Sequence, residues 1–240
     1  MRENLSWFDQ VYIIKPSEFL VYFKLPDIEQ VLIFWKNMKN ILLLGSKSQS
    51  RQMLLREVQI PFKIVGQNAD ETQCDWGLPL PQLVQKIALY KMNHVVLPGG
   101  DDGAICFVLT ADTLSQDKSG KVQGKPIDKN DAIIKIKMAR EGTYLCTAFC
   151  LDKKIWRNGT WHVQERIEEL VSVEYNFIVP DDWIDIYLEK SSGLQASNAI
   201  AVEEFGGQFL QEVRGSYSAI VGLPLFQVRE ALEHIGFFAH

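Results

Sequence analysis

The sequence predicts an α/β protein with a mixed central sheet flanked by helices. In the first half of the chain, short apolar runs alternate with segments of helical periodicity, a pattern typical of strands joined by helices. In the second half, strand-like runs follow one another more closely, which indicates a mixed sheet rather than a purely parallel one. With 240 residues, of which 47% are hydrophobic, the chain can bury a substantial core.

The composition argues against several classes of function. A formal net charge of −5 disfavours broad binding to nucleic acids or anionic membranes, because both need an excess of Lys and Arg. No run reaches the length of about 18 uncharged apolar residues that suggests a membrane span. The cysteines lack a C-x-x-C spacing, which favours buried thiols in a reducing cytosol over a metal or redox centre: Cys74, Cys106, Cys146 and Cys150. We therefore expect a cytoplasmic protein with no nucleic-acid or membrane partner.

The first 38 residues form an extension that is unusually rich in aromatic side chains and is broken by Pro16 and Pro26. Its charges are mixed and its start is not basic, so it does not resemble a signal peptide. The extension is interpreted either as an added arm or subunit contact, or as an artefact of the start codon, because Met38 directly precedes the first clear strand. We expect the main domain to span residues 39–240.

The first clear strand, residues 41–44, runs through a small polar loop into a helix. Free backbone N–H groups at a helix start form an anion site. Ser46 and Ser48 add hydroxyl groups and Arg51 adds a charged fork. An ordinary serine N-cap explains much of the same pattern, so both interpretations stay open.

A second strand, residues 62–65, leads into Asp70 and Glu71, which predict either a divalent-cation site or a solvated acidic turn. The helix that follows, from about residue 80 to 96, carries an apolar stripe into which Lys91 falls. A lysine on a buried face is costly unless it is paired or extends to a polar site. We favour a functional partner for it.

The central strand is predicted over residues 105–111, with Asp112 and Thr113 at its carboxyl end, where α/β sheets bind their ligands. After a polar turn, Gly124-Lys125-Pro126 returns a cation to the same region. One anion and one cation at the mouth of a strand suit a metal-bound phosphate ligand. The alternative is a solvated hairpin with incidental charges.

The remaining elements follow in order. They are a helix from Asp128 to about residue 140, a strand over 144–151, a turn over 153–160, an alternating strand over 171–177, a helix from Asp181, a strand over 208–213, a turn over 215–218, and a last helix that begins at Pro224 and closes at Gly236.

Several of these segments resemble the Maf family of nucleotide pyrophosphatases, which shares a fold with inosine triphosphatases. The resemblance covers about residues 39–237 and implies two lobes with a cleft. It depends on seven short motifs in order: Leu44-Gly45-Ser46-Lys47-Ser48 with Arg51, Asp70-Glu71, Ala88 with Lys91, Ala111-Asp112-Thr113, Gly124-Lys125-Pro126, Gly215-Ser216-Tyr217-Ser218, and Val221-Gly222-Leu223-Pro224-Leu225.

The resemblance implies a metal-dependent enzyme that cleaves a nucleoside triphosphate between its α- and β-phosphates, giving a nucleoside monophosphate and pyrophosphate. Asp112 would activate water or bind the metal, and Glu71 would help to hold Mg²⁺ or Mn²⁺. The other roles are carried by Lys91 and Lys125, which would neutralise the triphosphate, by Ser46, Ser48 and Arg51, which would seat it, and by Thr113 as a further substrate contact. A homodimer is expected from the resemblance alone.

Two departures from the family pattern bear on the substrate. The usual loop S-x-S-P-R-R lacks its proline and first arginine here, where Gln49 and Ser50 stand. Glu203 replaces a glutamine of the dTTP/UTP branch, and a carboxylate suits the paired N–H donors of guanine, as in the branch that prefers 7-methylguanosine triphosphate. The dipeptide Asp112-Thr113 is instead the sequence typical of the dTTP/UTP branch. The balance leans slightly towards the methylated purine.

Two other functions remain open. A catalytically weak Maf-like regulatory or interaction protein that acts on cell division would explain the missing loop arginine and the aromatic extension. A general inosine-triphosphate sanitiser fits the motifs less well. The four retained charged residues, Glu71, Lys91, Asp112 and Lys125, favour the enzyme.

Overall fold

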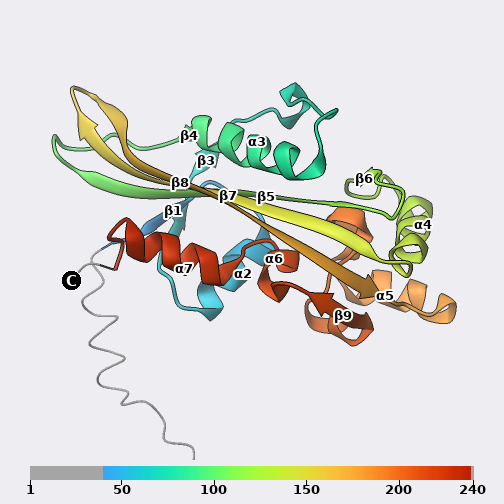
Figure 1. The fold of residues 1–240 in the computed structure, drawn as a ribbon. Coiled ribbons are helices and arrows are strands. Elements are labelled where there is room, and N and C mark those ends of the chain that lie inside the picture. Colours follow the sequence, from blue (N-terminus) through green and yellow to red (C-terminus); the bar gives the residue numbers. More distant parts are fainter. Residues whose placement is uncertain (1–39, 239–240) are drawn as a thin grey trace, which may run out of the picture. The chain divides into compact units, whose positions relative to one another are not determined.

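A seven-stranded mixed sheet organises residues 40–238, the part of the chain that the computed structural model describes (Figure 1). The strand order is β2-β1-β5-β7-β8-β9, and β6 pairs with β5. The strands are β1 (Leu42–Leu44), β2 (Phe62–Ile64), β5 (Ile105–Gln116), β6 (Val122–Gln123), β7 (Thr143–Arg157), β8 (Thr160–Phe177) and β9 (Leu210–Arg214). A separate two-stranded sheet pairs β3 (Gly66–Gln67) with β4 (Val95–Val96).

The strands are parallel on one side of the sheet and antiparallel on the other. β1 runs parallel to β2 and β5, with Leu42 opposite Phe62 and Phe107. The pairs β5–β7, β7–β8 and β8–β9 are antiparallel, and a tight turn joins β7 to β8. The predicted mixed sheet flanked by helices is therefore confirmed. The cleft between two lobes and the domain boundary near residue 39 stay predictions, and the aromatic extension lies outside the described residues.

Helices cover both faces of the sheet (Figure 1). On one face lies α3 (Leu80–Asn93); on the other lie α2 (Gln49–Glu57), α6 (Tyr217–Val221) and α7 (Leu225–His234). Two further helices, α4 (Lys129–Ala139) and α5 (Ile184–Lys190), lie beyond the end of β5 and β7. The 3-10 turns are η1 (Glu71–Gln73), η2 (Asp181–Trp183), η3 (Gly193–Gln195), η4 (Ser197–Ala199) and η5 (Glu204–Phe209).

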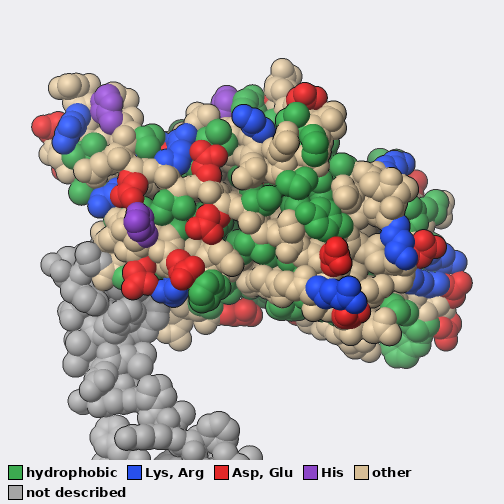
Figure 2. Space-filling model, viewed as in Figure 1, with side chains coloured by type: hydrophobic (Ala, Val, Ile, Leu, Met, Phe, Trp, Pro, Cys, Tyr) green, Lys and Arg blue, Asp and Glu red, His purple; other side chains and the backbone are tan. Residues whose placement is uncertain are grey.

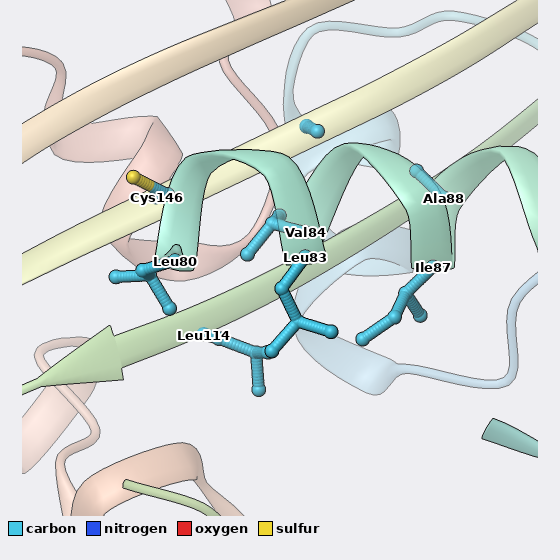
Figure 3. Packing of buried hydrophobic residues seen from close by; sticks show 8 residues of the cluster. Leu80, Leu83, Val84, Ile87, Ala88, Leu114 and Cys146 are labelled. Carbon is cyan, nitrogen blue, oxygen red and sulfur yellow. The ribbon is translucent and has the colours of Figure 1, made fainter. Parts of the chain in front are cut away.

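The apolar stripe of α3 packs directly on the sheet (Figure 3). Its buried members meet side chains of β5 and β7 in one cluster: Leu80, Leu83, Val84, Ile87 and Ala88 from the helix, with Leu114, Cys146 and Ala148 from the strands. Burial of these side chains supplies the hydrophobic free energy that holds α3 in place. The helix is thus a fixed support from which Lys91 projects one turn further on.

Several predicted helix boundaries are confirmed by their caps. Ser48 Oγ accepts from the Arg51 N–H at the start of α2, and Asp128 Oδ1 accepts from the Asp131 N–H at the start of α4. Gly236 follows α7 with a positive φ of 78°, which an L-residue rarely adopts. At its other end α2 stops at Glu57, and Val58, which caps it, is exposed.

The hairpin β7–β8 is much longer than the sequence indicates. The predicted turn over 153–160 is wrong except for its last residues, because only Asn158 and Gly159 separate the strands, both with positive φ. The polar stretch stays in the ladder because its charges are paired: Asp152, fully buried, accepts from Arg166 at 2.6 and 2.7 Å and from Lys154 at 2.8 Å. Because these charges are paired, β7 and β8 are longer than the apolar periodicity predicts.

Two other predicted elements change character. The turn expected over 215–218 becomes the short helix α6, and the strand expected from residue 208 begins only at Leu210, after the turns of η5. No helix among residues 40–238 is long and apolar enough to cross a membrane. On the face shown in Figure 2, acidic and basic side chains are interspersed and no continuous basic field is visible.

Candidate functional site

The sheet places Asp112 differently from the prediction. Asp112 does not end its strand, because β5 continues past it to Gln116, paired throughout with β7. It is β1 that stops, at Leu44 opposite Leu109, so the next residues of β5 lose their neighbour on that side. The candidate site therefore lies at the carboxyl end of β1, beside the middle of β5.

Gly45 lets the chain leave β1 close against the neighbouring strand. Its N–H donates to the Leu109 carbonyl at 2.9 Å, and a Cβ built on it would lie 2.8 Å from Thr110 Cγ2. A side chain at this position would push the following loop away from β5. The loop that carries Ser46 and Ser48 is thus held next to Asp112 and Thr113 by the absence of a side chain.

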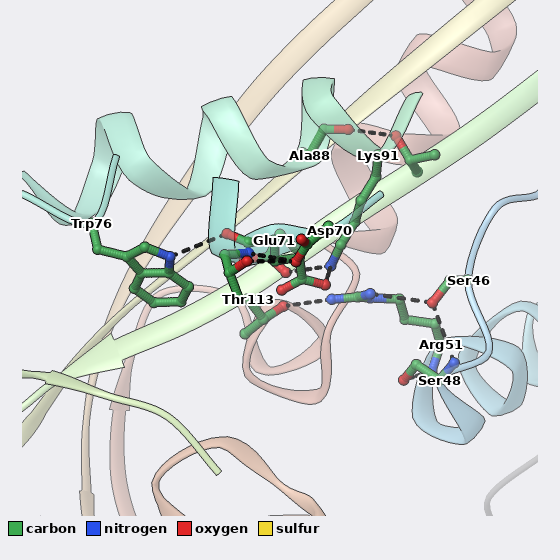
Figure 4. Close-up of polar contacts among 12 residues, drawn as sticks. Ser46, Ser48, Arg51, Asp70, Glu71, Trp76, Ala88, Lys91 and Thr113 are labelled. Carbon is green, nitrogen blue, oxygen red and sulfur yellow. Dashed lines mark hydrogen bonds and ion pairs between the residues drawn. The ribbon is translucent and has the colours of Figure 1, made fainter. Parts of the chain in front are cut away.

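Lys91 joins two of the predicted acidic residues (Figure 4). Its Nζ lies 2.7 Å from Asp112 Oδ1 and 2.8 Å from Glu71 Oε1. The side chains of Lys91 and Asp112 are only 11% and 8% exposed, whereas that of Glu71 is 43% exposed. The buried face of α3 therefore carries a charge with partners, as the sequence predicted, and the cluster opens to solvent on the Glu71 side.

The adjacent Asp70 does something different from Glu71. Its carboxylate accepts from the Thr72 N–H at 3.1 Å and from the Thr72 hydroxyl at 2.7 Å, and these bonds lower its pKa. Asp70 therefore holds the turn η1, which aims Glu71 at Lys91. Of the two predicted adjacent carboxylates, only Glu71 contacts the charged cluster.

Arg51 forms the second part of the site. Its Nε donates to the Gly222 carbonyl at 2.9 Å, Nη1 donates to Ser46 Oγ at 3.2 Å, and Nη2 donates to Thr113 Oγ1 at 3.2 Å. Burial lowers the pKa of the guanidinium, and the charges of Asp112 and Glu71 oppose that effect. These bonds use three of the five guanidinium N–H donors, which leaves two for an anion.

The two loop serines are occupied with local structure. Ser46 Oγ accepts from the Ser48 N–H at 3.2 Å as well as from Arg51, and Ser48 Oγ caps α2. The N-cap interpretation of the loop is therefore correct for Ser48. Both hydroxyls nevertheless line the helix start at which an anion would bind.

Two predicted residues are not part of this cluster. Lys125 is exposed, and its contact within residues 40–238 is made by its backbone carbonyl, which accepts from Lys135 Nζ at 3.2 Å. Glu203 lies just before η5 beside Tyr217, whose hydroxyl donates to the Val202 carbonyl at 3.1 Å. Burial and the charge of Glu203 both raise the pKa of Tyr217.

Two residues that the sequence did not single out complete the geometry. Thr147 is fully buried on β7 and its hydroxyl lies 2.9 Å from that of Thr113. Gly222 supplies the carbonyl that binds Arg51 Nε. A threonine inside an apolar run gives no sequence signal of its partner, and Gly222 is visible only as part of a motif.

The donor set suits a hard divalent cation that is shared with a ligand. Asp112 Oδ2 is buried and has no hydrogen-bond partner within residues 40–238, and Glu71 offers a second carboxylate. The described residues contain no group of three or more His, Cys, Asp or Glu side chains that could hold a metal. Mg²⁺ is commonly held by one or two carboxylates together with substrate phosphates and water, which these residues fit.

A separate hollow of about 400 Å³ lies beyond the end of β5. Four carboxylates and two cations line it: Asp117, Glu141, Glu174 and Glu212, with Lys118 and Arg214. This excess of negative charge does not suit a polyphosphate, and none of the predicted site residues lines the hollow. We therefore place the candidate site at the cluster around Lys91 and Arg51.

Comparisons with known proteins bear on the family of the chain. The sequence model of a family described as Maf-like protein matches residues 41–235. A nucleoside triphosphate pyrophosphatase of Prochlorococcus marinus is 30% identical over 207 residues, covering 80% of this chain and 98% of the relative. A dTTP/UTP pyrophosphatase of Anaeromyxobacter dehalogenans is 33% identical over 199 residues (82% and 94%), and one of Clostridium beijerinckii is 29% identical over 194 residues (80% and 98%).

Proposed function

The chain belongs to the Maf family, and from that premise we propose that it is a hydrolase that cleaves nucleoside triphosphates to a nucleoside monophosphate and pyrophosphate. Relatives at about 30% identity that carry this activity in their names support the proposal. The observation that carries it is the pairing of Lys91 with two carboxylates directly beside the Arg51 fork. Such a cluster offers both signs of charge beside the carboxyl end of β1.

The reaction needs one bond to form and one to break. The oxygen of a water molecule attacks the α-phosphorus while the bond from that phosphorus to the α–β bridging oxygen breaks. Asp112 Oδ2, which has no partner among the described residues, accepts the proton of the attacking water. Pyrophosphate leaves with the electron pair of the broken bond.

The cations of the site act on the charge that develops during this step. Lys91 spends two of its three N–H donors on Asp112 and Glu71, which leaves the third for a phosphate oxygen. The two remaining N–H groups of Arg51 and the start of α2 would seat the chain of phosphates. Lys125 would approach the same anion from the exposed turn before α4, a role that stays a prediction.

We further propose that the enzyme depends on Mg²⁺ or Mn²⁺, held by Asp112 and Glu71 together with the substrate. When bound, the cation would stabilise the negative charge on the phosphate oxygens as a Lewis acid. A homodimer is also proposed on the family resemblance, and light scattering in solution tests it. A cytoplasmic location is proposed on the cysteine pattern.

The preferred base is the finer part of the proposal. We infer a pyrimidine triphosphate, dTTP or UTP, since relatives are named for these substrates and Asp112-Thr113 matches that branch. The second candidate is 7-methylguanosine triphosphate. It is favoured by Glu203, a half-buried carboxylate next to the exposed ring of Tyr217, because guanine presents paired donors to a carboxylate.

The experiment is to measure pyrophosphate release from dTTP, UTP, CTP, GTP, ITP and 7-methyl-GTP, with Mg²⁺ or Mn²⁺ and again with excess EDTA. Asp112→Asn should lower kcat by roughly 10²–10⁴-fold, the usual contribution of a general base. Asp128→Asn is the matched control, because asparagine caps α4 as well as aspartate does.

Each outcome separates two interpretations. Release from dTTP and UTP supports the pyrimidine assignment, whereas release from 7-methyl-GTP that is lost in Glu203→Gln supports the methylated purine. Activity that survives EDTA contradicts the metal proposal. If the folded, metal-loaded chain releases pyrophosphate from none of these triphosphates, the enzyme proposal is overturned. That result would favour a catalytically weak regulatory protein acting on cell division.

A further inference from the structure

We propose that Thr147 is a positioning residue that orients the Arg51 fork for the substrate's phosphates through a directed series of hydrogen bonds. The inference rests on the proposed function insofar as Arg51 binds the triphosphate. Thr147 itself is fully buried on β7, so it touches neither solvent nor substrate. Any effect that it has on the reaction must therefore pass through other residues.

The series joins four elements of the fold. Arg51 Nη2, on α2, donates to Thr113 Oγ1, on β5, at 3.2 Å. The Thr113 and Thr147 hydroxyl oxygens lie 2.9 Å apart across the β5–β7 ladder, in which the two residues are direct partners. Thr147 Oγ1 then donates to the Ala219 carbonyl, on α6, at 2.7 Å. We call these three bonds the threonine relay.

The chemistry of its two ends gives the relay a single direction. A guanidinium only donates and a carbonyl only accepts. The one O–H of Thr147 is therefore committed to Ala219, so Thr147 must accept from the O–H of Thr113. Thr113 in turn presents its lone pairs to Arg51. Without the Thr147 hydroxyl, the O–H of Thr113 loses its acceptor and is free to rotate away from β7.

A second bond ties Arg51 to the same short helix. Gly222 directly follows α6, and its carbonyl accepts from Arg51 Nε at 2.9 Å. Its φ is +131°, and a Cβ built on it would lie 3.4 Å from both Cγ and Nε of Arg51. The guanidinium is thus held at two points of one element, by Gly222 directly and by Ala219 through the threonine relay. Its plane is fixed rather than free to turn about Nε.

The test measures binding of inorganic tripolyphosphate to the metal-free full-length chain by calorimetry, and pyrophosphate release from the best triphosphate. Thr147→Val keeps the side-chain shape and removes the hydroxyl. We expect it to weaken tripolyphosphate binding and to raise KM by about tenfold, the upper end of the range for loss of a neutral hydrogen bond. Thr147→Ser, which restores the hydroxyl, should return both values to within about threefold of the wild type.

Thr110→Val is the matched control. Thr110 is equally buried on β5 and its hydroxyl also donates to a backbone carbonyl, that of Ala88 at 2.8 Å, but it does not contact Arg51. The Thr110→Val variant should lose about as much stability as Thr147→Val, while its tripolyphosphate binding and KM stay within about threefold of the wild type. Equal weakening in Thr110→Val and Thr147→Val would overturn the proposal, because a general loosening of the sheet would then explain both.

A double-mutant cycle with Arg51→Lys identifies the route of the effect. A lysine has no fork to orient, so Thr147→Val should weaken binding by less than about threefold in that background. The full loss in both backgrounds would overturn the proposal, as would a wild-type chain that binds no tripolyphosphate. If the wild type binds tripolyphosphate and Thr147→Val weakens it, but no triphosphate is hydrolysed, the positioning role stands and the proposed enzyme function fails.

Discussion

Replacing Lys91 by methionine should destabilise the protein by about 3 kcal/mol, because it leaves a buried carboxylate without its partner. Methionine keeps an apolar stem in the stripe of α3 and removes only the charge and its donors. The ammonium group lies 2.7 Å from Asp112 Oδ1 and 2.8 Å from Glu71 Oε1, so one substitution breaks both ion pairs.

The two broken pairs differ in cost. The side chain of Glu71 is 43% exposed, so water screens its pair and the loss is at most about 1 kcal/mol. The side chain of Asp112 is 8% exposed, and removal of one partner from a buried pair costs about 3–5 kcal/mol. The nearby charge of Arg51 interacts favourably with Asp112 and offsets part of this cost, which places the total near the lower end of that range.

The assay is urea unfolding at pH 7, supported by thermal unfolding, in which a loss of about 3 kcal/mol corresponds to roughly 6–12 °C for a domain of this size. The double variant Lys91→Met with Asp112→Asn removes both charges and should recover stability to within about 1 kcal/mol of Asp112→Asn alone. A loss below about 1 kcal/mol in Lys91→Met, or strictly additive losses in the double variant, would show that the pair is not buried as described.

Two further predictions concern stability away from the site. Asp152→Asn should lower the free energy of unfolding in urea by about 3 kcal/mol, because Arg166 and Lys154 lose a fully buried counter-charge. Activity per folded molecule should stay at the wild-type value. A drop in kcat would contradict the separation of this cluster from the site. Burial raises the pKa of Tyr187 to about 12, above the value of about 10 in an unfolded chain, so its contribution to stability is complete below about pH 10 and is lost between pH 10 and 12. Tyr187→Phe should flatten that alkaline decline while lowering stability at pH 7, since the hydroxyl accepts from the Ala201 N–H at 2.8 Å; an unchanged alkaline slope would contradict the assignment.

The fold class and the site motifs were predictable from local sequence patterns. The ends of the strands that carry the motifs were not. The position of Lys91 in an apolar stripe predicted a buried charge with a partner, and the structure pairs it with Asp112 and Glu71. The same reasoning placed Asp112 at the end of its strand, which is wrong because the length of β5 depends on its pairing with β7. Strand ends that are set by a neighbouring strand are invisible to a window of local sequence.

The partners of polar residues inside the sheet were likewise not predictable from local sequence. The extension of β7 past Asp152 depends on Arg166, which lies on the opposite strand, and local polarity alone argued for a turn there. Thr147 could be predicted as a strand residue, but its role depends on Thr113 and Ala219 from distant parts of the chain. Sequence periodicity reports which face is buried and does not report which polar groups meet there.

The two-residue loop between β7 and β8 also has a kinetic consequence. A loop of only Asn158 and Gly159 brings the two strands together at little cost in chain entropy. Isolated hairpins form in roughly 1–10 μs. The parallel pairing of Leu42 with Phe107 needs a large intervening loop to close first. Refolding should therefore protect the β7–β8 amides from hydrogen exchange before β1 and the loop that follows it are in place beside β5. A polyphosphate that binds beside this loop should then slow unfolding and leave the rate of refolding unchanged.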